Sequence, residues 1–188
     1  MVMKKVTVFM LALLVALGAV AQNKEHMKFM SIPMGITINT FQNRLIAKGA
    51  KYDNFSKYLS KGTRAFEGNF AGQKSAIYIY YDETSKKVYR AKVVIDRNDK
   101  AMIDQLFDEF YAMYQEKYGE EAFITTPVND DLGFKTSSVY TALGRIDLFI
   151  READADYITH SKKYYNLHID YFDSAAESEN KSNRLDDL

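Results

Sequence analysis

The sequence contains no cysteine, no tryptophan and only two prolines in 188 residues. Without cysteine the chain has no disulfide framework, no thiolate nucleophile and no thiolate metal ligand, so its stability must come from packing. The sequence also lacks the Gly-x-Ser-x-Gly motif, and no glycine-rich phosphate loop precedes a helix. We therefore expect no cofactor, no metal and no assigned catalytic residue.

An excess of either charge is also lacking, with 25 Lys and Arg against 25 Asp and Glu. Proteins that bind nucleic acid rely on clustered Lys and Arg to neutralise phosphates. The balanced composition therefore argues against nucleic acid as a partner.

The N-terminal residues have the pattern of a signal peptide. Lys4 and Lys5 precede an apolar run over residues 6–17, and Ala19-Val20-Ala21 offers a small-x-small cleavage site. The run is shorter than the ~20 residues that a membrane span needs, which disfavours the alternative of an uncleaved anchor. We predict a signal peptide over residues 1–21, export to the periplasm or the medium, and no membrane span after cleavage.

The remaining chain has the length of one domain, and we predict a single α+β domain over residues 22–173. One helix is expected from Ile38 to Lys48, after a Thr37 cap, and a second between Asp99 and Gly119. Residues 174–188 contain no aromatic side chain and are expected to form a disordered tail.

Alternating apolar and polar residues predict strands over residues 64–71, 76–82, 88–96, 138–143, 145–151 and 164–172. Short connections between them indicate antiparallel hairpins with one solvated face. In the second strand, alternation separates Ile77 and Ile79 from Tyr78 and Tyr80. In the third, it groups Tyr89 with Ala91, Val93 and Ile95.

The expected order, a helix and three strands, occurs twice. We therefore predict duplicated αβββ units, with pseudo-repeats over residues 32–96 and 99–172 and both helices on one face of an antiparallel meander sheet. The sequence similarity between the halves is modest, because any two amphipathic strands align to some degree.

The segment from Ile32 to Gly49, with its Gly-Ile-Thr helix start and closing glycine, resembles the SmpA/OmlA-type envelope lipoproteins. With the element order over residues 32–172, the chain resembles the β-lactamase-inhibitor-protein-like (BLIP-like) fold. Its leader is similar to those of many exported proteins of Gram-negative gut bacteria. The lipoprotein cysteine and the inhibitor's disulfides are missing here, so neither anchoring nor inhibition carries over. The resemblance implies a fold that usually binds proteins and seldom catalyses.

Tyrosine occurs 14 times and phenylalanine 12 times, which is high for a chain of this length. Half-buried strand positions explain most of them. Tyr78 and Tyr80, together with Tyr140 and Phe149, are the residues that we predict to form an exposed aromatic binding surface, because tyrosine is favoured at protein interfaces.

A polar cluster is expected on the last strand, where alternation puts His168 and Asp170 on one face, with Asp147 on the adjacent strand. A histidine and two carboxylates are suitable for metal binding or general-base chemistry. A solvated sheet face explains the same pattern.

Three functions remain open from the sequence. The first is an exported, non-catalytic binding module that engages a protein or cell-envelope component through an aromatic sheet face. The second is a small hydrolase-like or metal-dependent enzyme that uses His168 and Asp170. The third is a homodimer that buries the exposed tyrosines against a second copy.

Overall fold

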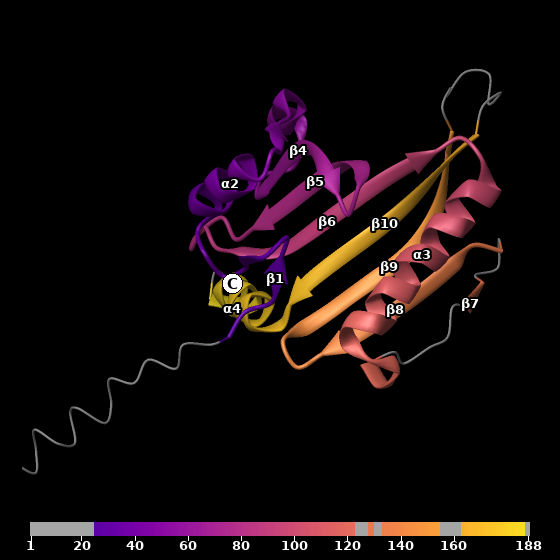
Figure 1. Ribbon diagram of the computed structural model, residues 1–188. Coiled ribbons are helices and arrows are strands. Elements are labelled where there is room, and N and C mark those ends of the chain that lie inside the picture. Colours follow the sequence, from indigo (N-terminus) through magenta and orange to yellow (C-terminus); the bar gives the residue numbers. More distant parts are fainter. Residues whose placement is uncertain (1–24, 123–127, 130–132, 155–162, 187–188) are drawn as a thin grey trace, which may run out of the picture.

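The computed structural model describes residues 25–122, 128–129, 133–154 and 163–186 (Figure 1). The predicted signal peptide lies outside these residues. No helix in the described part of the chain is long and apolar enough to cross a membrane.

The protein is built around an eight-stranded antiparallel sheet with strand order β3-β4-β5-β6-β10-β9-β8-β7. The strands are β3 Lys51–Tyr52, β4 Thr63–Phe70, β5 Gln73–Tyr81, β6 Val88–Arg97, β7 Val128–Asn129, β8 Lys135–Thr141, β9 Gly144–Asp154 and β10 Lys163–Asp173. The central pair, β6 and β10, joins the N-terminal strands to the C-terminal strands. The predicted α+β class and antiparallel meander are confirmed.

Two helices form where their caps predict them. Helix α2, Ile38–Ala47, follows Thr37 and ends before Gly49, which has the left-handed φ of 93°. Helix α3, Lys100–Tyr118, begins where the Asp99 side chain accepts a hydrogen bond from the backbone N–H of Met102 at 3.0 Å. A capping carboxylate satisfies one of the free N–H groups at a helix start, which explains this boundary.

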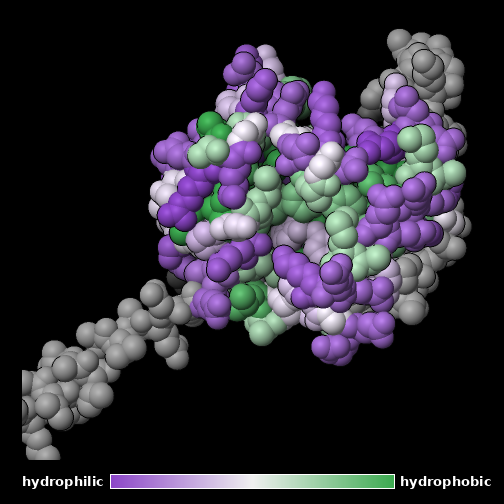
Figure 2. All heavy atoms as spheres, viewed as in Figure 1, coloured by the Kyte–Doolittle hydropathy of each residue, from purple (hydrophilic) through white to green (hydrophobic). Residues whose placement is uncertain are grey.

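Both helices pack on the same face of the sheet. Helix α3 crosses β6, β8, β9 and β10 (Figure 1), and the hydroxyl of its Tyr114 is hydrogen-bonded to that of Tyr171 on β10. Helix α2 buries one stripe of apolar residues. On β4, Arg64 shares a face with buried Phe66 and donates to Gln42 of α2 at 2.7 Å. Viewed from this side, hydrophilic residues surround a hydrophobic area in the middle (Figure 2).

The N-terminal segment completes the core. Strands β1, Lys28–Phe29, and β2, Ile32–Pro33, form a small hairpin, and the Phe29 ring stacks on Phe70 at 5.6 Å. Ile32 and Met34, in the segment that leads into α2, are buried. The buried residues form one continuous core that spans both halves of the sheet. A duplication of the two halves stays a prediction.

The prediction of a disordered tail over residues 174–188 is wrong for most of that segment, because Ser174–Asp186 form helix α4. The buried carboxylate of Asp173 caps this helix, accepting from the N–H of Ala176 at 2.7 Å and from the N–H of Met27 at 2.6 Å. Lys87 pairs with Glu179 of the helix at 2.6 Å. A cap and a docking site stabilise this segment, although its own sequence carries few apolar residues.

Two further differences concern strand boundaries and loops. The register between β5 and β6 shifts after Tyr80, which pairs with Arg90, so that Tyr81 pairs with Val88. Tyr89 is the extra residue of this bulge, and Val88 joins the core where Tyr89 was expected. The segment between α3 and β8 contains the short helix η2, Glu120–Ala122, and strand β7. Another short helix, η1, Asn54–Tyr58, precedes β4.

Candidate binding surface

The face of the sheet turned away from α2 and α3, here called the outer face, carries the predicted site residues. Side chains alternate along each strand, so the neighbours of buried core residues point outward. Tyr78 and Tyr80 flank the buried Ile79 on β5, and His168 and Asp170 flank the buried Ile169 on β10. The outer-face residues of neighbouring strands stand opposite one another in the register.

One row of outer-face side chains alternates aromatic rings and guanidinium groups across five strands. The members of this arginine row are Tyr80 on β5, Arg90 on β6, Phe172 on β10, Arg145 on β9 and Tyr140 on β8. The guanidinium carbon of Arg90 lies 4.7 Å from the ring centres of both Tyr80 and Phe172. That of Arg145 lies 4.7 Å from Phe172 and 6.0 Å from Tyr140. Each of these contacts is a cation–π interaction, so the row is held together from strand to strand.

Each arginine of the row has its own carboxylate. Arg90 donates from Nη2 to Asp170 Oδ2 at 2.9 Å and from Nε to Asp170 Oδ1 at 3.3 Å. Burial acts to lower the pKa of Arg90, but the hydrogen bonds and charge of Asp170 outweigh it and the pKa is raised. Arg145 Nε lies 3.0 Å from Asp147 Oδ2, and the Ser138 hydroxyl donates to the other oxygen of Asp147 at 2.7 Å. The charges of the arginine row are therefore compensated within the protein.

The two tyrosines of β5 keep their hydroxyls protonated at neutral pH. Burial, more than any other cause, raises the pKa of Tyr78 and Tyr80 above its ordinary value; the Arg90 charge opposes this at Tyr80. Both side chains are half-buried. Each offers a ring surface and a neutral hydroxyl to a ligand.

A second group of outer-face residues carries cations that form no ion pair with a carboxylate of the described residues. We call Lys92, Phe149, Arg151 and His168 the cationic patch. The imidazole of His168 stacks on the Phe149 ring at 4.8 Å with an interplanar angle of 4°. The Lys92 ammonium lies 5.7 Å from the centre of the same Phe149 ring and the Arg151 guanidinium 5.2 Å from it.

The electrostatics of the cationic patch differ from those of the arginine row. Burial, followed by the charges of Lys92 and Arg151, lowers the pKa of His168 to about 3, so the imidazole is neutral at physiological pH. Burial is the largest cause and lowers the pKa of Lys92; the charge of Asp170 opposes this, whereas those of Arg90 and Arg151 act in the same direction as burial. Among the described residues, the buried Nδ1 of His168 has no hydrogen-bond partner.

The polar cluster expected from sequence is only partly assembled. Asp170 and Asp147 stand directly opposite one another on β10 and β9. Asp170 is bound by Arg90, however, and among the described residues no hydrogen bond joins His168 to either carboxylate. No group of three or more His, Asp or Glu side chains in the described ranges is placed to hold a metal ion. The enzyme hypothesis on His168 and Asp170 stays a prediction that gains no geometric support.

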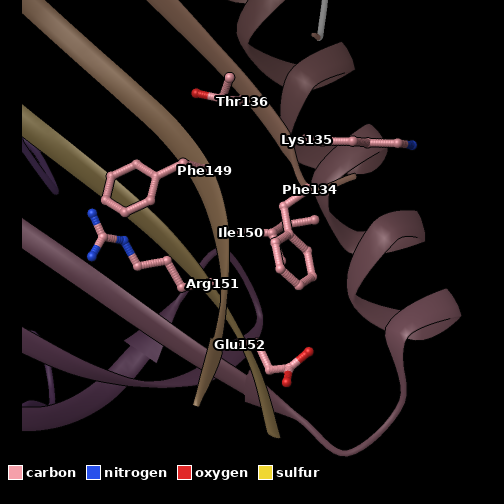
Figure 3. Close-up of a pocket in the computed structure, with 7 residues that line it drawn as sticks. All are labelled: Phe134, Lys135, Thr136, Phe149, Ile150, Arg151 and Glu152. Carbon is pink, nitrogen blue, oxygen red and sulfur yellow. The ribbon is translucent and has the colours of Figure 1, made fainter. Parts of the chain in front are cut away.

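A hollow of about 490 Å³ adjoins the cationic patch. Its lining residues are Phe134, Lys135, Thr136, Phe149, Ile150, Arg151 and Glu152. Phe149 and Arg151 project on one side of β9, and Ile150 lies toward α3 with Phe134 (Figure 3). The patch is thus next to space that a ligand group can enter.

All seven residues singled out from sequence lie on the outer face. Tyr140 and Phe149 do not adjoin Tyr78 and Tyr80, because β6 and β10 lie between them. Patterns in the sequence did not single out the other members of the row and the patch, four cations and one aromatic residue: Arg90, Lys92, Arg145, Arg151 and Phe172. Alternation already placed Arg90 and Lys92 opposite the core, but only the strand register shows what they contact.

No protein-family model, curated protein sequence or solved structure matches this chain.

Proposed function

We propose that the mature chain is an exported, non-catalytic binding protein that engages a protein or cell-envelope component through its outer sheet face. The observation that carries this proposal is the arginine row. It presents half-exposed rings and guanidinium groups in one row across the strands, held by cation–π contacts of 4.7 Å and by the carboxylates of Asp170 and Asp147.

Preorganisation is the physical reason for this choice. Association costs the freedom of every side chain that becomes ordered at the interface, about 0.5–1.5 kcal/mol for each flexible one. Arg90 and Arg145 already have fixed partners, so their immobilisation is not a cost of binding. Tyrosine and arginine are also the residues enriched among those that dominate interface energies.

The proposal is tested by affinity capture with tagged residues 22–188 against envelope and secreted fractions of the producing bacterium. Tyr80→Ala and Tyr140→Ala remove the two ends of the arginine row. Met113→Ala on α3 is the matched control, because Met113 and Tyr140 are both 44% exposed but lie on opposite sides of the sheet. Urea unfolding of each variant verifies that the fold is retained.

We expect one stoichiometric partner that is retained by Met113→Ala and lost with Tyr80→Ala or Tyr140→Ala. Equal capture by all three variants would contradict the proposal. Light scattering of the free protein identifies the remaining case: a doubled mass that Tyr140→Ala abolishes would mean that the partner is a second copy of this chain.

A further inference from the structure

The outer face holds two kinds of cation, which differ in whether they form an ion pair with a carboxylate of the described residues. Arg90 and Arg145 each lie within 3.0 Å of a carboxylate oxygen. Lys92 and Arg151 contact the ring of Phe149 instead, and neither forms an ion pair with a carboxylate of the described residues.

We infer that the cationic patch is an anion subsite of the outer face, and that it takes a carboxylate from an acidic segment of a partner protein. This inference rests on the proposed function and names the chemistry of the partner. Lys92 and Arg151 approach Phe149 from β6 and β9, so a carboxylate between their charged groups meets a positive group from each strand. The imidazole between those strands is neutral and adds no charge of its own to the patch.

A carboxylate also relieves an unfavourable arrangement. Lys92 is half-buried, and although Asp170 attracts its positive charge, burial disfavours it and Arg90 and Arg151 repel it. An anion placed against Lys92 and Arg151 offsets this repulsion, and the low-polarity surroundings of Phe149 strengthen the attraction. The adjoining hollow of about 490 Å³ gives room for the segment that carries the carboxylate.

Charge and surface chemistry favour an acidic protein segment over an anionic lipid surface. Adsorption to anionic membranes depends on clusters of about 4–8 Lys and Arg residues. The patch has two cations that form no ion pair among the described residues, and the whole chain carries equal numbers of basic and acidic residues. The neighbouring Tyr78, Tyr80 and Tyr140 are side chains of the type that contribute most to protein–protein contacts.

The test uses calorimetric titration of the mature chain, residues 22–188, at low salt, where screening is weak. The probe is acetyl-hexaglutamate amide, and acetyl-hexaglutamine amide is the neutral control peptide. Lys92→Met and Arg151→Met remove one charge each and keep an apolar stem. Lys117→Met is the matched control variant, because Lys117 also lies over an aromatic ring, that of Tyr118 at 4.8 Å, but on α3.

We expect saturable binding of the glutamate peptide with a Kd below about 1 mM, and none of the glutamine peptide. Lys92→Met and Arg151→Met are each expected to weaken it by about five-fold, whereas Lys117→Met leaves it unchanged. The absence of binding, or equal affinities in all three variants, would overturn the inference. Binding of inorganic phosphate in place of the glutamate peptide would overturn the assignment to an acidic protein segment.

Failure of the anion subsite is distinguishable from failure of the proposed function. If a partner captured from bacterial fractions is lost with Tyr140→Ala but retained by Lys92→Met and Arg151→Met, the outer face binds a partner and only the anion subsite is wrong. If Tyr140→Ala also retains the partner, the proposed function itself fails.

Discussion

The arginine row and the cationic patch lie on the same sheet face and use the same types of side chain, yet their electrostatics differ. In the row, Asp170 and Asp147 stand where they meet Arg90 and Arg145. In the patch, Lys92 faces Asp170 across the β6–β10 register, but Arg90 binds that carboxylate, and the side chain stacked on Phe149 is neutral His168. A compensated cation stabilises the fold and shapes a surface, whereas an uncompensated one is available to a ligand. The comparison makes three predictions about stability, which follow in order of size.

The largest effect is expected from Asp170→Asn in the arginine row. The side chain of Asp170 is 3% exposed and that of Arg90 28%, so removing the carboxylate charge leaves a largely buried guanidinium uncompensated. Breaking a buried pair in this way costs about 3 kcal/mol, near the lower end of the usual range because Arg90 keeps some contact with water. Urea unfolding measures the loss.

Asp147→Asn is the control for that substitution. The side chains of the Arg145–Asp147 pair are 41% and 22% exposed, and a more exposed pair contributes less than about 1 kcal/mol. Equal losses for Asp170→Asn and Asp147→Asn would contradict the role assigned to burial in the row.

The next effect is acid sensitivity from the cationic patch. The unfolded chain protonates His168 near its ordinary pKa of about 6.5, but in the folded protein burial and the charges of Lys92 and Arg151 hold the pKa at about 3. Between these values the unfolded state binds more protons, so the free energy of unfolding falls as the pH is lowered from 6.5 toward 3. We expect a contribution on the order of 1–2 kcal/mol, discounted for the partial exposure of the ring.

Comparison with His168→Gln isolates this contribution, because glutamine does not titrate and retains hydrogen-bonding groups. Thermal unfolding between pH 7 and pH 4 should show a smaller loss of Tm for the variant than for the wild type. Parallel pH profiles would show that His168 is not held neutral by the patch.

The smallest effect, and one of opposite sign, is expected from Lys92→Met. Methionine keeps the apolar stem and removes a half-buried charge that burial, Arg90 and Arg151 together disfavour more than Asp170 favours it, so the free energy of unfolding should rise by about 0.5–1 kcal/mol. The same substitution should raise the pKa of His168, which NMR titration of the ring measures. Destabilisation together with an unchanged His168 pKa would mean that Lys92 is compensated after all.

Local patterns in the sequence predict much of this structure. Thr37, Gly49, Asp99 and Gly119 mark the helix boundaries, and the period-two alternation identifies the six long strands and their buried sides. These features depend on residues close together in the chain, which is why sequence reasoning finds them.

Features that depend on distant residues were not predictable in the same way. The bulge at Tyr89 follows from how Val88 pairs with Tyr81, and helix α4 depends on Asp173, whose carboxylate also holds the backbone of Met27. The ion pair between Arg90 and Asp170 depends on the β6–β10 register, which joins residues about 80 positions apart. Alternation assigned each side chain a face, but not a partner on that face.

The most direct test of the account is an amide NMR shift map of residues 22–188 titrated with acetyl-hexaglutamate amide. The account predicts shifts concentrated around Lys92, Phe149, Arg151 and His168, with the amides of α3 unaffected. Shifts centred on the helix side of the sheet, or no shifts at all, would contradict the assignment of the outer face as the surface that receives an anionic ligand.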